Sequence, residues 1–173
     1  MPELTQKHLK QIDLFSAHHY KPLPIVLSKG KGSQVWDIEG KEYIDFLSCY
    51  SALNFGHQHP ELVEALKSQL DKIAVVSRAF QTDNLGPFSE ELAAFCQKEM
   101  VLPMNSGAEA VETAVKLARK WAYAVKKVPE NKAKILVAAN NFHGRTLSVI
   151  SFSSEPLYQK DFDGPRERYA IKK

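Results

Sequence analysis

Residues 101–110 read Val-Leu-Pro-Met-Asn-Ser-Gly-Ala-Glu-Ala, an apolar run that leads into a turn of small residues. Ser106 and Glu109 have the S-x-x-E spacing of a capping box, which predicts that a helix begins here. The first amides of a helix lack partners within it, and the helix dipole is positive at that end. Because Gly107 and Ala108 leave the backbone uncovered, a phosphate can approach these amides. A capped helix start without any ligand explains the same residues, and the two interpretations are compatible.

The segments around this turn predict an α/β fold. Residues 101–104 read as a short strand, the helix that follows extends to about Lys127, and residues 134–139 read as a buried strand. A further helix is expected near Pro87, and residues 147–152 form another apolar run. Strands that alternate with helices are typical of an α/β domain with a largely parallel sheet.

The N-terminal part has a different pattern. Residues 5–19 predict a short amphipathic helix, and residues 34–38 and 41–46 predict a β-hairpin around a two-residue turn at Glu39-Gly40. Pro60 is suited to the first turn of another helix. We expect that helix to bury an apolar stripe, formed by Leu62, Val63, Leu66, Leu70 and Ile73.

Composition excludes several classes of protein. The 173 residues are 44% hydrophobic and 25% charged with a net charge of +3, which indicates a globular rather than a disordered chain. No apolar run reaches the roughly 18 residues that span a bilayer, and no secretory or transit signal is visible, so we expect a cytoplasmic protein without membrane contact.

The basic stretch Lys116–Lys127 is better explained by a solvated helix face than by nucleic-acid binding. The pair His57 and His59 lacks further ligands nearby, so no metal site is expected.

A second candidate site follows the strand predicted at residues 134–139. Residues 141–146 read Asn-Phe-His-Gly-Arg-Thr, and ligands of open α/β sheets bind beyond the carboxyl ends of strands. An aromatic ring, an imidazole and a guanidinium in this turn can stack on a ring and bind a carboxylate. A surface loop with an ordinary Phe anchor and a solvated Arg explains the pattern equally well. Tyr20 and Tyr50 lie in loops, where either can contact a ligand or pack half-buried.

Other catalytic signatures are absent from the sequence. It contains no G-x-G-x-x-G, no Walker loop, no G-x-S-x-G and no H-E-x-x-H motif. Hydride transfer through a Rossmann fingerprint and P-loop phosphoryl transfer therefore have no support in the sequence.

Taken in order, eight short motifs resemble the N-terminal part of the class-III pyridoxal-phosphate aminotransferases, and most closely the branch that acts on ornithine. The resemblance extends from about His19 to Pro165. The motifs are Tyr-Lys-Pro-Leu-Pro (20–24), Trp-Asp-Ile-Glu-Gly (36–40), Tyr-Ser-Ala-Leu-Asn (50–54), Gly-His-Gln-His-Pro (56–60), Ser-Arg-Ala-Phe (77–80), Leu-Pro-Met-Asn-Ser-Gly-Ala-Glu-Ala (102–110), Lys-Leu-Ala-Arg-Lys-Trp (116–121) and Asn-Phe-His-Gly-Arg-Thr (141–146).

The resemblance implies an α/β fold of the aspartate aminotransferase type (fold type I). Residues 1–60 would form an N-terminal segment with a helix and a β-hairpin, and residues 61–173 an incomplete large cofactor-binding domain with a parallel-rich sheet. The rest of the large domain and the C-terminal small domain would be missing. The family is dimeric, so the resemblance also implies a homodimer for the full-length protein.

The resemblance also assigns a cofactor, pyridoxal 5'-phosphate, and residues that bind it. Ser106, Gly107 and Ala108 would hold its phosphate, chiefly through backbone amides. Phe142 would stack on the pyridine ring, and His143 would lie beside it. These roles agree with the chemistry of the two candidate sites.

The implied substrates are ornithine and 2-oxoglutarate, which would yield glutamate semialdehyde and glutamate. Arg145 would pair with a substrate carboxylate, and Tyr20 and Tyr50 would line the pocket, with Tyr50 favouring ornithine. Another class-III enzyme, acting on acetylornithine or 4-aminobutyrate, is an alternative, as is a non-catalytic protein that associates with full-length subunits.

Two features depart from the family pattern. Phe55 stands where a glutamine is common in the ornithine branch, and the resemblance ends after Pro165. No lysine here, including Lys172 and Lys173 at the end, has the context of the Schiff-base lysine, which lies well downstream in the family with the acidic partner of the pyridine nitrogen. We therefore expect a fragment that lacks a catalytic lysine and does not transaminate alone. We also expect this fragment to expose an unpaired sheet edge and to be poorly soluble.

Overall fold

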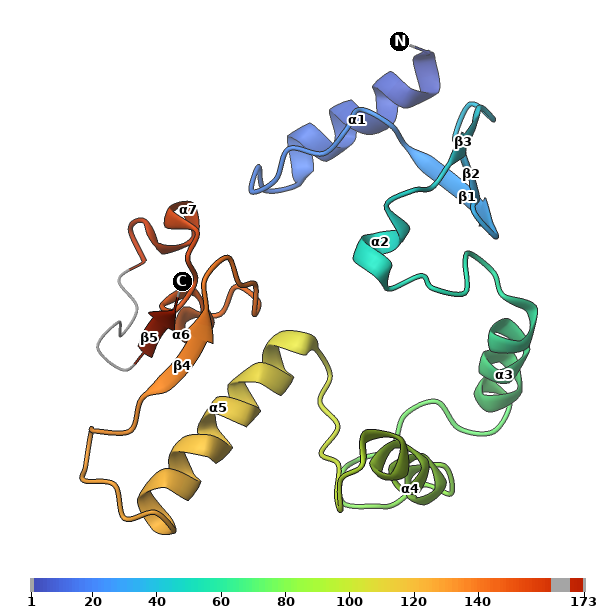
Figure 1. The fold of residues 1–173 in the computed structure, drawn as a ribbon. Helices are drawn as coiled ribbons and strands as arrows, with labels where there is room; N and C mark the ends of the chain where they lie inside the picture. The colour runs from blue at the N-terminus through green and yellow to red at the C-terminus, as the bar shows by residue number, and fades with distance from the viewer. Residues whose placement is uncertain (1, 163–168, 173) are drawn as a thin grey trace. The chain divides into compact units, whose positions relative to one another are not determined.

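The computed structural model describes residues 2–162 and 169–172 and shows a mixed α/β chain (Figure 1). The chain divides into two compact units, Met1–Thr82 and Asp83–Lys173, which are described separately below. The end of the family resemblance near Pro165 and the terminal Lys173 lie outside the described residues. The expected domain division at residue 60 stays a prediction.

The first unit is organised around a three-stranded antiparallel sheet. Its strands are β1 (Leu27–Lys31), β2 (Gln34–Asp37) and β3 (Glu42–Ile44), in the order β1-β2-β3. Val35 pairs with Tyr43 in the predicted hairpin, which is thereby confirmed. The connection spans residues 38–41 and is longer than the predicted two-residue turn, because the backbone of Asp37 pairs with both Gly40 and Lys41. The pattern of the sequence did not reveal β1.

The Asp37 carboxylate organises this longer connection. Its Oδ1 accepts hydrogen bonds from the backbone N–H groups of Glu39 (3.0 Å) and Lys41 (2.9 Å), and its Oδ2 accepts one from the Tyr43 hydroxyl (2.8 Å). The Tyr43 hydrogen bond is the main reason that the pKa of Asp37 lies below its ordinary value of 3.8. One ionised side chain therefore fixes both the turn and the start of β3.

The helix α1 (Glu3–Phe15) is shorter than the predicted segment 5–19 and is joined to the hairpin at its first turn. The backbone N–H and hydroxyl of Thr5 donate hydrogen bonds to Glu39 Oε1, at 2.9 and 3.1 Å. Thr5 is buried by this contact. A surface turn of the hairpin thus positions the N-terminal helix.

The helix α3 (Pro60–Leu70) begins at Pro60 as predicted, but the predicted burial of its apolar stripe is wrong. Leu62, Leu66 and Leu70 are each more than half exposed, and Val63 is only partly buried. Ile73 lies beyond the end of the helix and is also exposed. A helix buries its apolar face only against a partner, and no described element fully covers this one.

The second unit contains α4 (Leu85–Cys96), α5 (Gly107–Ala124), β4 (Ile135–Ala138), α6 (Leu147–Ile150), α7 (Pro156–Gln159) and β5 (Tyr169–Lys172). The strands β4 and β5 pair in parallel, as the α/β pattern predicts (Figure 1). The predicted strand at residues 101–104 is wrong, because these residues form an irregular segment without strand pairing. The strand predicted at residues 134–139 is confirmed as β4, but its predicted burial is wrong, because two of its side chains are exposed and the other two are only partly buried.

The core of the second unit lies after β4. Val149, Ile150 and Phe152 are buried, with Val149 and Phe152 only 1% exposed. The Asn141 side-chain amide donates hydrogen bonds to the carbonyls of Ala138 (2.6 Å) and Phe152 (3.1 Å). This amide therefore joins the end of β4 to the segment that follows α6.

The loop between β4 and α6 lies against the first turns of α5. Gly144 has φ +106°, and a Cβ added there would lie 2.8 Å from the Ala108 Cβ, closer than a methyl group can approach. The Thr146 hydroxyl also donates a hydrogen bond to the Glu112 carboxylate on α5. Only glycine combines this backbone conformation with so close a contact.

In the part of the chain that the structure describes, no helix combines the length and the apolar character that crossing a membrane requires.

We predict that Tyr43→Phe makes the first unit more sensitive to acid. Because its pKa is lowered, the Asp37 carboxyl binds fewer protons in the folded than in the unfolded state. Its contribution to the stability of the fold is therefore complete above the ordinary pKa of 3.8 and is lost as the pH falls through the pKa of the folded state. Removing the hydroxyl brings the pKa back towards 3.8, and the acid transition followed by circular dichroism moves to higher pH. Tyr20→Phe, at an exposed tyrosine outside the hairpin, is the control; equal transitions in both variants would contradict the prediction.

We predict that Gly144→Ala destabilises the second unit by about 1–3 kcal/mol, because the new methyl group meets Ala108 and the positive φ is strained for alanine. The measurement is the urea unfolding of the Gly144→Ala variant and of the wild-type chain. Gly86→Ala in α4, where an added Cβ meets no atom within 4 Å, is the matched control and leaves the midpoint unchanged or raises it. A Gly144→Ala chain as stable as the control would show that the loop does not need the contact.

Candidate functional site

The predicted helix start at Gly107 is confirmed, and its cap has the expected first half. Ser106 is the N-cap of α5, and its hydroxyl accepts a hydrogen bond from the backbone N–H of Glu109 at 3.2 Å. In a complete capping box the Glu109 carboxylate would accept a hydrogen bond from the backbone N–H of Ser106. Here it accepts one from the N–H of the preceding residue, Asn105, at 2.9 Å. No atom lies within 4 Å of the position that a Gly107 Cβ would occupy, so the first turn is open there.

The structure brings the two candidate sites of this unit together. The loop of residues 141–146 follows β4 and contacts the first turn of α5 through Gly144 and Ala108. His143 is held in this loop, since its Nδ1 lies 3.0 Å from the Asn141 Oδ1 and its ring packs edge-on against Phe152. The amides at the start of α5 and the imidazole therefore belong to one corner of the unit.

Phe142 and Arg145 are more open than His143. Phe142 is 64% exposed, and its ring packs edge to face against the ring of Tyr158, with the two ring centres 6.3 Å apart. The Arg145 guanidinium lies 5.6 Å from the centre of the same Tyr158 ring. Tyr158 on α7 thus contacts both residues, a role that sequence reasoning missed; Pro156, at the first turn of α7, was the one local signal of an element there.

Tyr20 and Tyr50 belong to the first unit, whereas the candidate cofactor residues belong to the second. Tyr20 lies in the irregular segment before β1 and is 59% exposed. Tyr50, 77% exposed, lies in the short segment α2 (Ser48–Ser51), whose four residues all have positive φ, between 47° and 71°. Left-handed backbone costs roughly 1–2 kcal/mol per non-glycine residue, so the surrounding structure must hold this turn.

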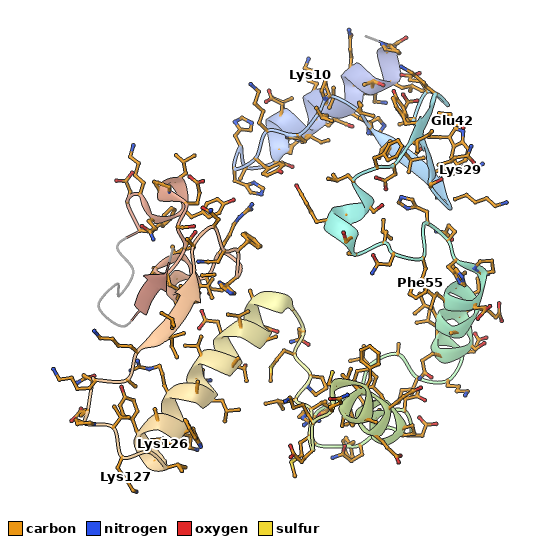
Figure 2. The ribbon with its side chains drawn as sticks, in the orientation of Figure 1. Lys10, Lys29, Glu42, Phe55, Lys126 and Lys127 are labelled. Atoms are coloured by element: carbon orange, nitrogen blue, oxygen red, sulfur yellow. The ribbon has the colours of Figure 1, made fainter. Side chains whose placement is uncertain are left out.

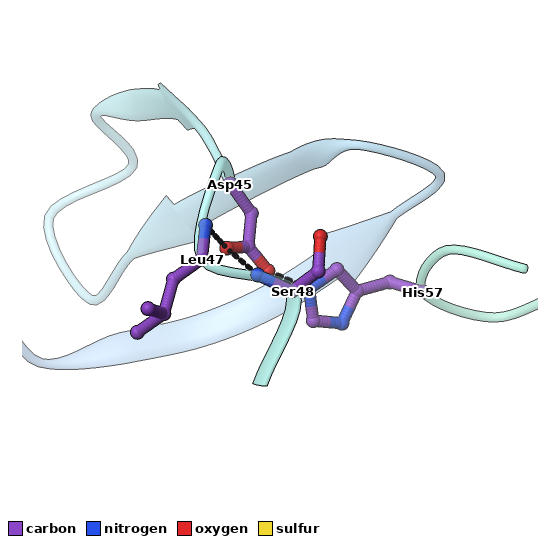
Figure 3. Close-up of polar contacts among 4 residues, drawn as sticks. All are labelled: Asp45, Leu47, Ser48 and His57. Atoms are coloured by element: carbon purple, nitrogen blue, oxygen red, sulfur yellow. Dashed lines mark hydrogen bonds and ion pairs between the residues drawn. The ribbon is translucent and has the colours of Figure 1, made fainter. Parts of the chain in front are cut away.

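A hydrogen-bonded aspartate and histidine lie at the ends of the segment that carries Tyr50 (Figure 3). Asp45 Oδ1 accepts hydrogen bonds from the N–H groups of Leu47 (3.0 Å) and Ser48 (2.9 Å), and Oδ2 accepts one from His57 Nε2 (2.9 Å). These hydrogen bonds hold the pKa of Asp45 below its usual range, and the bond from the Ser48 amide has the largest effect, the bond from His57 the second largest. The pair borders an open hollow of about 320 Å³, together with Asn54 and Phe55. Sequence reasoning did not identify Asp45.

The lysines of the predicted basic stretch lie only partly on a helix, because α5 ends at Ala124, before the predicted end near Lys127. Lys126 and Lys127 follow the C-terminal end of α5, and the Lys126 ammonium lies 5.0 Å from the centre of the Trp121 ring (Figure 2). The described residues contain no group of three or more His, Cys, Asp or Glu side chains that could hold a metal ion. Cys49 and Cys96 are free and exposed.

Comparison with known proteins identifies the family. The model of the class-III aminotransferases matches residues 15–169. The ornithine aminotransferase of Brevibacillus brevis is 59% identical over 161 residues, which are 93% of this chain and 40% of the relative, and that of Bacillus subtilis is 55% identical over the same length. The chain thus spans about 40% of the length of the curated relatives it matches.

Solved structures give the same result. An ornithine aminotransferase from Toxoplasma gondii matches 97% of this chain and 39% of its own length, with a TM-score of 0.93 and 39% identity. An acetylornithine aminotransferase from Elizabethkingia anophelis matches 97% of this chain and 40% of its own length, with a TM-score of 0.80 and 50% identity. With the helix start, the loop after β4 and these matches in agreement, the chain belongs to the class-III aminotransferase family, whose members depend on pyridoxal phosphate.

Proposed function

We propose that this chain is the part of an ornithine aminotransferase that binds the cofactor phosphate and ring and lines the substrate pocket. The reaction is the transfer of the δ-amino group of ornithine to 2-oxoglutarate, in a homodimeric enzyme of fold type I. The observation that carries the proposal is the contact of Gly144 with Ala108, because it places the loop Phe142–Arg145 beside the open helix start. The Brevibacillus and Bacillus relatives, both ornithine aminotransferases, support the choice of substrate.

The residues present fit pyridoxal phosphate. The open position at Gly107 leaves room for a phosphate at the positive end of α5, where we assign the amides of Gly107 and Ala108 and the hydroxyl of Ser106 to phosphate binding. Phe142 presents an exposed aromatic face that can stack on the pyridine ring, and His143 lies next to it in a fixed orientation. When bound, the cofactor supplies an electron sink for amino-group transfer.

The substrate-binding residues differ in their chemistry. We assign Arg145 to a substrate carboxylate, because the guanidinium of this exposed residue can form a bidentate pair with it. Tyr20 and Tyr50 present exposed phenol groups for the remaining polar groups of ornithine. None of the chain's own lysines is assigned as the catalytic lysine, so these residues bind and orient the reactants without supplying the amine.

A second candidate is an acetylornithine aminotransferase. The solved structure from Elizabethkingia anophelis favours it, at 50% identity over 97% of this chain. The two substrates share the δ-amino group that is transferred and differ at the α-nitrogen, which is charged in ornithine and acylated in acetylornithine, so a substrate comparison separates the candidates.

We predict that Phe142→Ala weakens binding of the cofactor about 3- to 10-fold, the contribution of one aromatic contact. Pyridoxamine phosphate is the probe, since it lacks the aldehyde that reacts with surface lysines, and its fluorescence is followed during titration with the chain. Phe95→Ala, at an exposed phenylalanine on α4, is the control and has no effect. Equal affinities for both variants would remove Phe142 from the site.

We predict that the 173-residue chain alone does not transaminate, whereas a hybrid does. In the hybrid, this chain replaces the matched 161 residues of the Brevibacillus brevis enzyme, which supplies the rest of the protein. The hybrid should prefer ornithine to acetylornithine by roughly tenfold or more in kcat/KM, and Tyr50→Ile should reduce that preference. A hybrid that prefers acetylornithine would establish the second candidate, and turnover by the isolated chain would contradict the absence of a catalytic lysine.

A further inference from the structure

The segment that carries Tyr50 is strained and therefore needs a support. Four consecutive non-glycine residues, Ser48–Ser51, have φ values of 47°, 47°, 55° and 71°. Runs of left-handed backbone persist only where the surroundings over-determine them, and they concentrate where a side chain must be presented to a ligand. Tyr50, the third residue of this run, is 77% exposed.

The Asp45 carboxylate contacts both ends of this segment. One of its oxygens binds the amides of Leu47 and Ser48 at the entry of the turn, and the other binds His57 beyond its exit, at 2.9 Å (Figure 3). Capping the two amides at the entry of the turn requires only the first carboxylate oxygen, so the bond of the second oxygen to His57 has a separate role. The bond to His57 closes the segment of residues 46–56 into a loop.

His57 is in turn fixed to the sheet of the first unit. Its backbone N–H and carbonyl both pair with Gly32 at 2.8 Å. Its ring lies so close to Gly30 that a Cβ added there would meet it at 2.7 Å. Because the far end of the loop is anchored at β1, the Asp45–His57 contact transmits the rigidity of the sheet to the strained turn.

We propose that Asp45 is a positioning residue of the enzyme: its carboxylate locks the left-handed turn so that Tyr50 is presented to the substrate in one conformation. The inference rests on the proposed function only for the role of Tyr50. The lock itself is a property of this chain, and it is tested without cofactor or substrate.

The test is hydrogen–deuterium exchange of the full 173-residue chain, read by mass spectrometry for residues 46–57 and, as an internal reference, for residues 34–44. In Asp45→Ala we expect exchange in residues 46–57 to accelerate at least about tenfold, with the hairpin reference unchanged. Asp45→Asn keeps an oxygen for the two amides and should be intermediate. Asp71→Asn, at the end of α3, is the matched control and behaves as wild type.

Unchanged exchange of residues 46–57 in Asp45→Ala would overturn the proposal. If that variant loses protection in the hairpin as well, His57→Gln replaces it, since it removes only the imidazole. Faster exchange in residues 46–57 with a protected hairpin then supports the lock, and wild-type exchange overturns it.

A kinetic arm separates the lock from the proposed function. In the hybrid enzyme, Asp45→Asn should raise KM for ornithine severalfold with a smaller change in kcat, whereas Asp71→Asn changes neither. If Tyr50→Ile leaves the preference for ornithine unchanged, the pocket role of Tyr50 fails while the exchange result for Asp45 still stands. If the exchange result is negative while Tyr50→Ile acts as expected, the lock fails and the proposed function stands.

Discussion

The close contact between the Gly144 backbone and Ala108 is the constraint on which the candidate cofactor site depends. It requires small residues on both sides, a glycine with positive φ in the loop and a short side chain on the helix. With this contact in place, the amides at the start of α5, the imidazole of His143 and the ring of Phe142 belong to one corner of the second unit. The contact therefore turns two separate sequence motifs into one site.

Carboxylates have the corresponding role in the first unit. Asp37 holds the hairpin connection and Asp45 holds the turn that carries Tyr50, each through two backbone amides and one side chain. Both have a lowered pKa, because hydrogen-bond donors stabilise their ionised forms. An ionised group that satisfies several donors at once fixes backbone that has little apolar surface to bury.

Several features were predictable because their causes are local. The S-x-x-E spacing located the start of α5, and Pro60 located the start of α3. The turn signal between two strand-like segments located the hairpin, and a continuous apolar run located β4. Other features were not, because they depend on distant partners. The bonds of Asp45 to His57 and of Thr5 to Glu39, and the packing of Tyr158 against Phe142, have no signature in the spacing of residues.

The sequence by itself determined the family, the positions of the main helices and the residues that are candidates for the cofactor and substrate. Motif order and local propensity carry that information, since they depend on neighbours within a few residues. The tertiary structure decided that the loop after β4 lies on the first turn of α5, that residues 101–104 form no strand, and that Ser48–Ser51 turn left-handed. These outcomes depend on contacts across the chain, where van der Waals distance and hydrogen-bond partners, rather than local pattern, select the conformation.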